Sequence, residues 1–111
     1  MKIGEEVIVE LISNEVELSK AQDALDLMGR CFPLGVKKII IRQENIIPEF
    51  FDLKTGIAGE MLQKFVNYYF KVIIVGDYSK YTSNALKDFI YESNKQGEII
   101  FISSLEEISG K

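Results

Sequence analysis

KKIIIR, residues 37–42, places three consecutive isoleucines between charged residues. A strand that is apolar at every position is typical of a sheet that is covered on both faces. Two further runs of this kind, VIIV at 72–75 and EIIFI at 98–102, follow later in the chain, and VIVELI at 7–12 precedes them. These four runs of branched and aromatic residues predict four strands.

Three segments with helical spacing separate the strands, because their apolar residues recur at intervals of three and four positions. Each begins near a side chain whose oxygen can accept a hydrogen bond from the first turn of a helix, and two of them end at Gly or Pro. The expected starts are Ser19 with Gln22 in a capping box, Asp52 or Thr55 after Pro48, and Thr82 or Ser83, and the expected ends are Pro33 with Gly35, and Gly97.

The connections between the predicted strands are too long for hairpins, and each contains a helix. Such connections are right-handed crossovers between parallel strands. The sequence therefore predicts an α/β fold with a mostly parallel sheet of four to five strands and helical crossovers, in a single domain over residues 1–111. The side chains expected to be nearly fully buried are Ile39, Ile41, Phe65, Val72, Ile74, Leu86, Phe89 and Ile100.

The composition excludes several classes of function. The chain contains no histidine, which removes Ser-His-Asp and Cys-His catalysis and HExxH zinc sites. Its one cysteine, Cys31, lies on the apolar side of the first predicted helix, where we expect a buried structural thiol rather than a nucleophile. The formal net charge of −4 offers no basic face to phosphates, so we expect no nucleic-acid partner, and the residues indicate neither a metal nor a cofactor.

The hydropathy pattern bears on location and self-association. No apolar run approaches the ~18 residues of a membrane span, and the first residues lack the basic and apolar regions of a signal peptide. We therefore expect a cytoplasmic protein that has no membrane partner. The strand at 7–12 carries few charges and lies in a short sheet with unprotected edges, so a homodimer is an open alternative to a monomer.

The loops that follow the carboxyl ends of the strands are the expected functional face, because helix N-termini and free backbone amides converge there in parallel sheets. The most suggestive loop contains Glu49 and the run Asp52-Leu53-Lys54-Thr55-Gly56. A hydroxyl followed by glycine at a helix start can meet a phosphate or the backbone of a partner. The simpler interpretation is that Thr55 or Asp52 only caps the helix.

A second loop holds Asp77, Tyr78, Ser79, Lys80 and Tyr81. It places two aromatic side chains around a lysine, and an exposed tyrosine is a frequent anchor of protein interfaces. Packing of both rings against neighbouring loops is an equally open interpretation. We treat these five residues, together with those around Thr55, as the candidate binding residues.

The stretches NIIPEFFDLKTGIAGEMLQKFVNY (45–68) and VGDYSKYTSNALKDFIYESNK (75–95) resemble a family of small bacterial proteins known only as a domain of unknown function. The resemblance extends over most of the chain. It implies no activity.

The order of elements, and the strand, loop and helix between Lys38 and Tyr68, are also similar to STAS domains, the fold of anti-sigma factor antagonists. In those domains an Asp-x-Ser/Thr-Gly turn carries a hydroxyl that is phosphorylated to switch partner binding. The resemblance implies that Thr55 is a phosphorylation site, although one additional residue separates Asp52 from the hydroxyl and Lys54 replaces a small residue.

The lack of histidine, of a nucleophile–base pair and of a metal cluster favours binding over catalysis. The leading hypothesis is a regulatory module that switches between protein partners through these loops. Two alternatives stay open: a sensor that holds a small ligand or anion, and an enzyme that uses Glu49, Asp52 or Asp77 as a base. A cavity of roughly 300 Å³ or more at this edge would favour a ligand, and a flat face with tyrosines would favour a protein partner.

Overall fold

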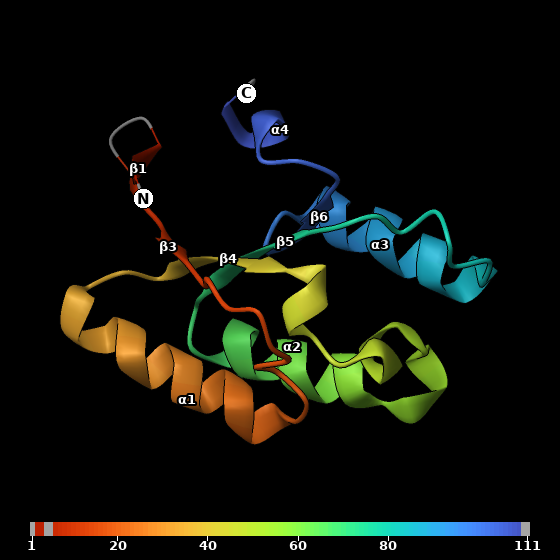
Figure 1. The fold of residues 1–111 in the computed structure, drawn as a ribbon, viewed down its shortest axis with the longest axis horizontal. Coiled ribbons are helices and arrows are strands. Elements are labelled where there is room, and N and C mark those ends of the chain that lie inside the picture. Colours follow the sequence, from red (N-terminus) through yellow and green to blue (C-terminus); the bar gives the residue numbers. More distant parts are fainter. Residues whose placement is uncertain (1, 4–5, 110–111) are drawn as a thin grey trace.

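The computed structural model describes residues 2–3 and 6–109, and a four-stranded parallel sheet runs through its centre (Figure 1). The strands follow one another across the sheet in chain order, and each is parallel to the next: β3 (Val9–Glu10), β4 (Lys38–Arg42), β5 (Lys71–Val75) and β6 (Ile99–Ile102). The predicted α/β fold with a mostly parallel sheet is confirmed.

The first strand is shorter than predicted. The expected strand over 7–12 contributes only Val9 and Glu10 to the parallel sheet. Val7 pairs instead with Lys2 in a small antiparallel ribbon formed by β1 (Lys2–Ile3) and β2 (Glu6–Val7). Polar and apolar residues alternate little in this stretch, so the sequence alone does not show where one pairing gives way to the other.

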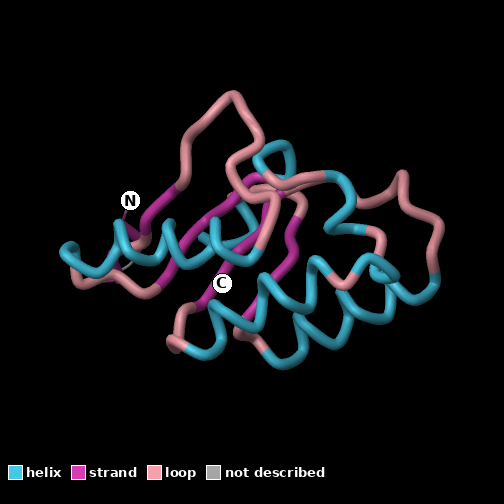
Figure 2. The backbone as a smooth tube through the Cα atoms, turned by 90° about the horizontal axis from the view of Figure 1, so that it is seen from below, coloured by secondary structure: helices cyan, strands magenta, loops and turns pink. Residues whose placement is uncertain are grey.

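Three helices cover one face of the sheet, as seen from below in Figure 2, where they lie in front of the strands. They are α1 (Ala21–Cys31), α2 (Ile57–Asn67) and α3 (Asn84–Gln96), and each connects one strand to the next. Right-handed crossovers between strands in consecutive order place every helix on the same face. No helix in the part of the chain that the structure describes is long and apolar enough to cross a membrane.

The main core lies between the sheet and these helices. In the sheet, Ile39 pairs with Val72, and Ile41 pairs with Ile74, so that all four side chains are buried on the helical face. Six of the eight predicted core residues have at most 2% of their surface exposed. The other two, Phe89 and Ile100, are only partly buried. Phe89 packs at the margin of the core with its ring centroid 6.0 Å from that of Phe101, and Ile100 faces the other side of the sheet.

The second face of the sheet carries a smaller cluster made of Ile8, Ile40, Ile73, Val75 and Ile102. Leu105, just before α4 (Glu106–Ser109), packs against this cluster. In Figure 1 the β1–β2 ribbon and α4 lie on this side, opposite to α1 and α2. The two faces therefore have unequal covers: three long helices on one side and the two ends of the chain on the other.

The start of α1 differs from the predicted capping box of Ser19 and Gln22. The carboxylate of Asp23 takes this role, because its Oδ2 accepts hydrogen bonds from the backbone N–H groups of Ser19 at 2.9 Å and Lys20 at 3.1 Å. Burial acts to raise the pKa of Asp23, but these bonds outweigh it and hold the pKa below its ordinary value. Gln22 donates to Asp26 along the helix.

The start of α2 also differs from the predicted cap by Asp52 or Thr55: its N-cap is Gly56, without a side-chain cap, and Asp52 caps the 3-10 helix Leu53–Thr55 before it. α1 ends at Cys31, and a short 3-10 helix that contains Pro33 continues to Gly35. Both predicted ends of α3 are confirmed. Ser83 caps α3 by accepting from the backbone N–H of Leu86 at 3.2 Å, and Gly97 closes this helix in a left-handed conformation. Cys31 is buried as expected, and burial raises the pKa of its thiol.

Candidate functional site

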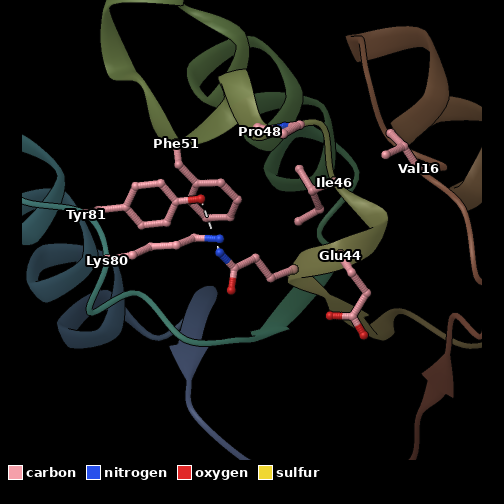
Figure 3. Close-up of a pocket in the computed structure, with 8 residues that line it drawn as sticks. Val16, Glu44, Ile46, Pro48, Phe51, Lys80 and Tyr81 are labelled. Carbon is pink, nitrogen blue, oxygen red and sulfur yellow. Dashed lines mark hydrogen bonds between the residues drawn. The ribbon is translucent and has the colours of Figure 1, made fainter.

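β3, β4 and β5 are parallel, so their carboxyl ends lie at one edge of the sheet, and residues of the loops that follow them come together there. Between these loops is an open hollow of about 250 Å³. The residues that line it come from all three loops and are drawn in Figure 3: Val16, Gln43, Glu44, Ile46, Pro48, Phe51, Lys80 and Tyr81. We call it the carboxyl-edge hollow.

Gln43 holds the walls of the hollow together. It follows β4 directly, its Oε1 accepts a hydrogen bond from the backbone N–H of Asp77 at 2.8 Å, and its Nε2 donates to the hydroxyl of Tyr81 at 3.2 Å. A Cβ atom on Gly76 would lie only 2.3 Å from Gln43 Oε1, so no other residue fits at position 76 without displacing this amide. One side chain thus fixes the β4 loop relative to the β5 loop.

An aromatic wall closes one side of the hollow. The rings of Phe51 and Tyr81 are stacked, with centroids 5.1 Å apart and planes inclined by 18°. Lys80 lies along the same wall, with its Nζ 5.3 Å from the centroid of the Tyr81 ring (Figure 3). Sequence analysis identified Lys80 and Tyr81 but not Phe51, which comes from a different loop.

Tyr78 does not belong to this surface. Its hydroxyl donates to the carbonyl oxygen of Ile74 at 2.6 Å, and its ring meets Phe101 edge to face with centroids 5.6 Å apart. Burial raises the pKa of Tyr78 far above its ordinary value, and the charge of Glu107 adds to this effect. Tyr78 therefore supports the loop from inside and has little surface to offer a partner.

Opposite charges stand at the hollow, since Lys80 and Glu44 both line it. Apart from Gln43 and the hydroxyl of Tyr81, the rest of the lining is apolar and includes Val16 and Pro48, which are both exposed. This arrangement can bind an apolar group and can pair with a neighbouring charge of either sign.

The residues around Thr55 form a separate feature. Glu49, Asp52, Lys54 and Thr55 are all exposed, and none of them lines the carboxyl-edge hollow. They belong to two short 3-10 helices, Pro48–Phe51 and Leu53–Thr55, that lead into α2.

Thr55 is exposed and lies directly before α2, as the sequence predicts. The single proton of its hydroxyl is shared between the carbonyl oxygens of Glu49, 2.9 Å from Oγ1, and Asp52, 2.8 Å from Oγ1, and Oγ1 accepts from the backbone N–H of Ile57 at 3.3 Å. Asp52 caps the preceding turn by accepting from the backbone N–H of Lys54 at 3.2 Å. Both side chains thus shape the turn in which they lie.

Asp77 and Ser79 likewise form a turn. Asp77 Oδ1 accepts hydrogen bonds from Ser79 Oγ at 2.6 Å and from the backbone N–H of Ser79 at 3.0 Å, and these bonds lower the pKa of Asp77. Within the described ranges 2–3 and 6–109, no three acidic, Cys or His side chains come close enough to hold a metal ion. Glu49, Asp52 and Asp77 are therefore not gathered into an acidic cluster.

Asn45 is a structural residue that the sequence analysis did not identify. It is fully buried, and its Nδ2 donates to the carbonyl oxygens of Ser13 at 2.9 Å and Glu15 at 2.8 Å. The backbone carbonyl oxygen of Asn45 accepts hydrogen bonds from the backbone N–H groups of Glu17 and Leu18. These bonds hold the loop that carries Val16 against the end of β4. The signal in the sequence was the position of Asn45 directly before Ile46 and Ile47. When a polar side chain is buried, it is usually hydrogen-bonded, most often to backbone groups or water.

Three comparisons with known proteins complete the description of the site. A family model described as Domain of unknown function (DUF4180) matches residues 3–111. No curated protein and no solved structure matches.

Proposed function

Because the chain belongs to the DUF4180 family, whose function is unknown, we propose a function from the site itself: the protein is a binding module that receives a side chain of a protein partner in the carboxyl-edge hollow. The resemblance to partner-switching domains supports a regulatory role in a bacterial cytoplasm, which is part of the same proposal.

The size of the hollow carries this proposal. Pockets for small molecules usually enclose about 300 to 1,000 Å³ and bury most of the ligand. The carboxyl-edge hollow measures about 250 Å³ and is open on one side. It is therefore better suited to one protruding side chain, which is how partner proteins commonly anchor in such depressions.

The lining indicates the chemistry of the anchor. The ring of Tyr81, stacked on the buried ring of Phe51, offers a flat apolar wall, and Val16 offers an apolar rim. Lys80 stands beside this wall. We therefore expect a partner that inserts an aromatic or aliphatic side chain and places a carboxylate next to it.

The test compares variants of the hollow with a matched pair elsewhere. Lys80→Glu reverses the charge and Val16→Asp places a charge on the rim, whereas Lys95→Glu changes the equivalent aromatic–lysine pair of Tyr91 and Lys95 on α3. Affinity capture from the native cell with quantitative mass spectrometry should recover a protein with the wild type and with Lys95→Glu. Each hollow variant should lose it by about tenfold or more, the effect of an anchor worth ~1.4 kcal/mol or more. Equal capture by all four proteins would contradict the proposal.

A second candidate is the binding of a small anion, which the hydroxyl of Tyr81 and the ammonium of Lys80 at the same hollow favour. Native mass spectrometry of the protein purified from its own cells separates the two. A bound small molecule that Lys80→Glu abolishes would support a ligand sensor instead of a protein-binding module.

A further inference from the structure

Tyr69 is the only non-glycine residue in the described part of the chain with a left-handed backbone, at φ 62°. The other left-handed positions are Gly35, Gly56 and Gly97, each at the end or start of a helical segment. Glycine is the usual choice there because an L side chain is disfavoured in this conformation. Tyrosine at position 69 therefore needs an explanation.

The backbone hydrogen bonds around Tyr69 do not explain why a tyrosine stands at this position. The end of α2 is a Schellman motif, in which the N–H of Tyr69 donates to Val66 O at 3.0 Å and the N–H of Phe70 donates to Phe65 O at 2.9 Å. Glycine would make the same bonds with less strain. Packing does not explain the tyrosine either, because 82% of the residue's surface is exposed. What the tyrosine adds to the molecule is an exposed aromatic ring.

This ring stands between two hollows at the amino ends of the strands, opposite to the site described above. Tyr69 and Lys71 line both hollows, one of about 440 Å³ that also includes Lys37, and one of about 220 Å³ that also includes Glu98. Lys37 Nζ lies 6.0 Å from the centroid of the Tyr69 ring.

Two further aromatic residues follow the ends of α1 and α2 directly, and one of them, Tyr68, precedes Tyr69 in the chain. Phe32 and Tyr68 are about half exposed, and their ring centroids are 6.3 Å apart. We call the set Phe32, Lys37, Tyr68, Tyr69 and Lys71 the amino-edge surface. Aromatic residues are enriched in protein interfaces relative to the rest of the surface, and exposed apolar groups that are contiguous, unlike scattered single side chains, mark interaction sites.

The charges at the amino-edge surface indicate what kind of partner binds there. Among the residues with described side chains that line these two hollows, Lys37 and Lys71 are cations and Glu98 is the one acid, although the whole chain has a net charge of −4. A second copy of the chain would place lysines opposite lysines, which is unfavourable. A segment with carboxylates is attracted to this edge but repelled by most of the remaining surface.

We propose that the amino-edge surface binds an acidic segment of a partner protein, whose carboxylates pair with Lys37 and Lys71 and whose apolar side chain packs against Tyr69. This is a second binding site, independent of the carboxyl-edge hollow.

Selection from a phage-displayed library of random linear peptides on the wild-type protein tests this proposal. The recovered peptides should be enriched in Asp and Glu next to an aromatic or aliphatic residue, and their affinity should fall as salt is raised. Tyr69→Gly and Lys37→Glu should each weaken binding by about tenfold or more. The matched control is Tyr91→Ala with Lys95→Glu, which removes another exposed tyrosine–lysine pair, on α3, with 65% of Tyr91 exposed.

Three results would overturn the proposal. The first is peptides without acidic enrichment, or peptides that bind Tyr69→Gly as tightly as the wild type. The second is a lower urea midpoint for Tyr69→Gly, which would make Tyr69 a structural residue; we expect a midpoint equal to or above that of the wild type. The third is a wild-type dimer in sedimentation that Tyr69→Gly dissociates, which would make a second copy the occupant. Lys80→Glu should bind the peptides normally, so failure of the carboxyl-edge proposal leaves this one intact.

Discussion

Single residues in the β5 loop show how far residue type predicts a role. Tyr78 and Tyr81 look alike in the sequence, where both flank Lys80 in one polar loop. The turn formed by Asp77 and Ser79 directs Tyr78 inward, whereas Tyr81 stacks on Phe51 at the surface. That difference depends on contacts with residues far away in the chain. Sequence analysis treated both tyrosines as candidate binding residues, and the structure places only Tyr81 in the lining of the hollow.

Tyr78→Phe removes the hydroxyl that donates to Ile74 O while it retains the ring. The free energy of unfolding at neutral pH should fall by about 1 kcal/mol, the usual net value of one hydrogen bond. The pH dependence should change as well. Because the pKa of Tyr78 is raised in the folded state, its contribution is complete below the unfolded value of about 10 and is lost as the pH rises above it.

Urea unfolding at neutral pH and between about pH 10 and 11.5 checks both effects. The wild type should lose stability over that interval, and Tyr78→Phe should lose less. Tyr91→Phe is the control, since Tyr91 is exposed and its hydroxyl should contribute little at either pH. Parallel curves for all three proteins would show that the Tyr78 hydroxyl is not buried.

At the scale of elements, the sequence predicted strands and helices better than their ends. Uninterrupted apolar runs such as 72–75 leave little choice but a covered strand, and the structure has β5 there. The start of α1 was predicted wrongly because Asp23 competes with Gln22 for the same backbone donors, and a carboxylate is the stronger acceptor. The two 3-10 helices before α2 were not predicted, since they depend on Thr55 bonding back to Glu49 and Asp52.

The entry to α2 therefore depends on the Thr55 hydroxyl. Thr55→Ala leaves two backbone carbonyls without this donor and should reduce the free energy of unfolding by roughly 1 kcal/mol. Thr55→Ser keeps the donor and should lose less than half as much. Urea unfolding of the two variants measures the difference, and equal losses would assign the effect to the methyl group instead.

This result bears on the hypothesis that Thr55 is phosphorylated. A phosphate on Oγ1 replaces the proton that the hydroxyl donates, so modification would open the turn as well as add about −1.5 to −2 charge. Phosphopeptide mass spectrometry of the protein from its own cells tests the modification directly.

At the scale of the whole molecule, the parallel sheet could be predicted but the cover of its second face could not. Long crossover connections limit the topology to very few arrangements. The cluster of Ile8, Ile40 and Ile73 is closed by short elements near the ends of the chain, and no pattern in the sequence shows that they fold back over this face of the sheet. Sequence analysis also could not find the carboxyl-edge hollow as a whole, because its lining comes from three loops that meet only in the fold.

Removal of the chain after Ser104 deletes Leu105 and α4 and should uncover this second cluster. The loss of apolar contact should cost roughly 1 to 3 kcal/mol of unfolding free energy, and the exposed isoleucines should bind the dye ANS. Leu105→Ala should give part of the same loss. An unchanged urea midpoint with no dye binding in the truncated protein would show that α4 contributes nothing to the cover.

The consecutive order of the strands also has a consequence for synthesis on the ribosome. Each strand that emerges pairs with the strand made just before it, since β4 joins β3, β5 joins β4 and β6 joins β5. The growing chain thus always presents an open edge to the next unit, and no strand waits for a distant partner or must be inserted between two others. Such local pairing keeps loop-closure entropy low, so the nascent chain can gain structure one strand–helix unit at a time.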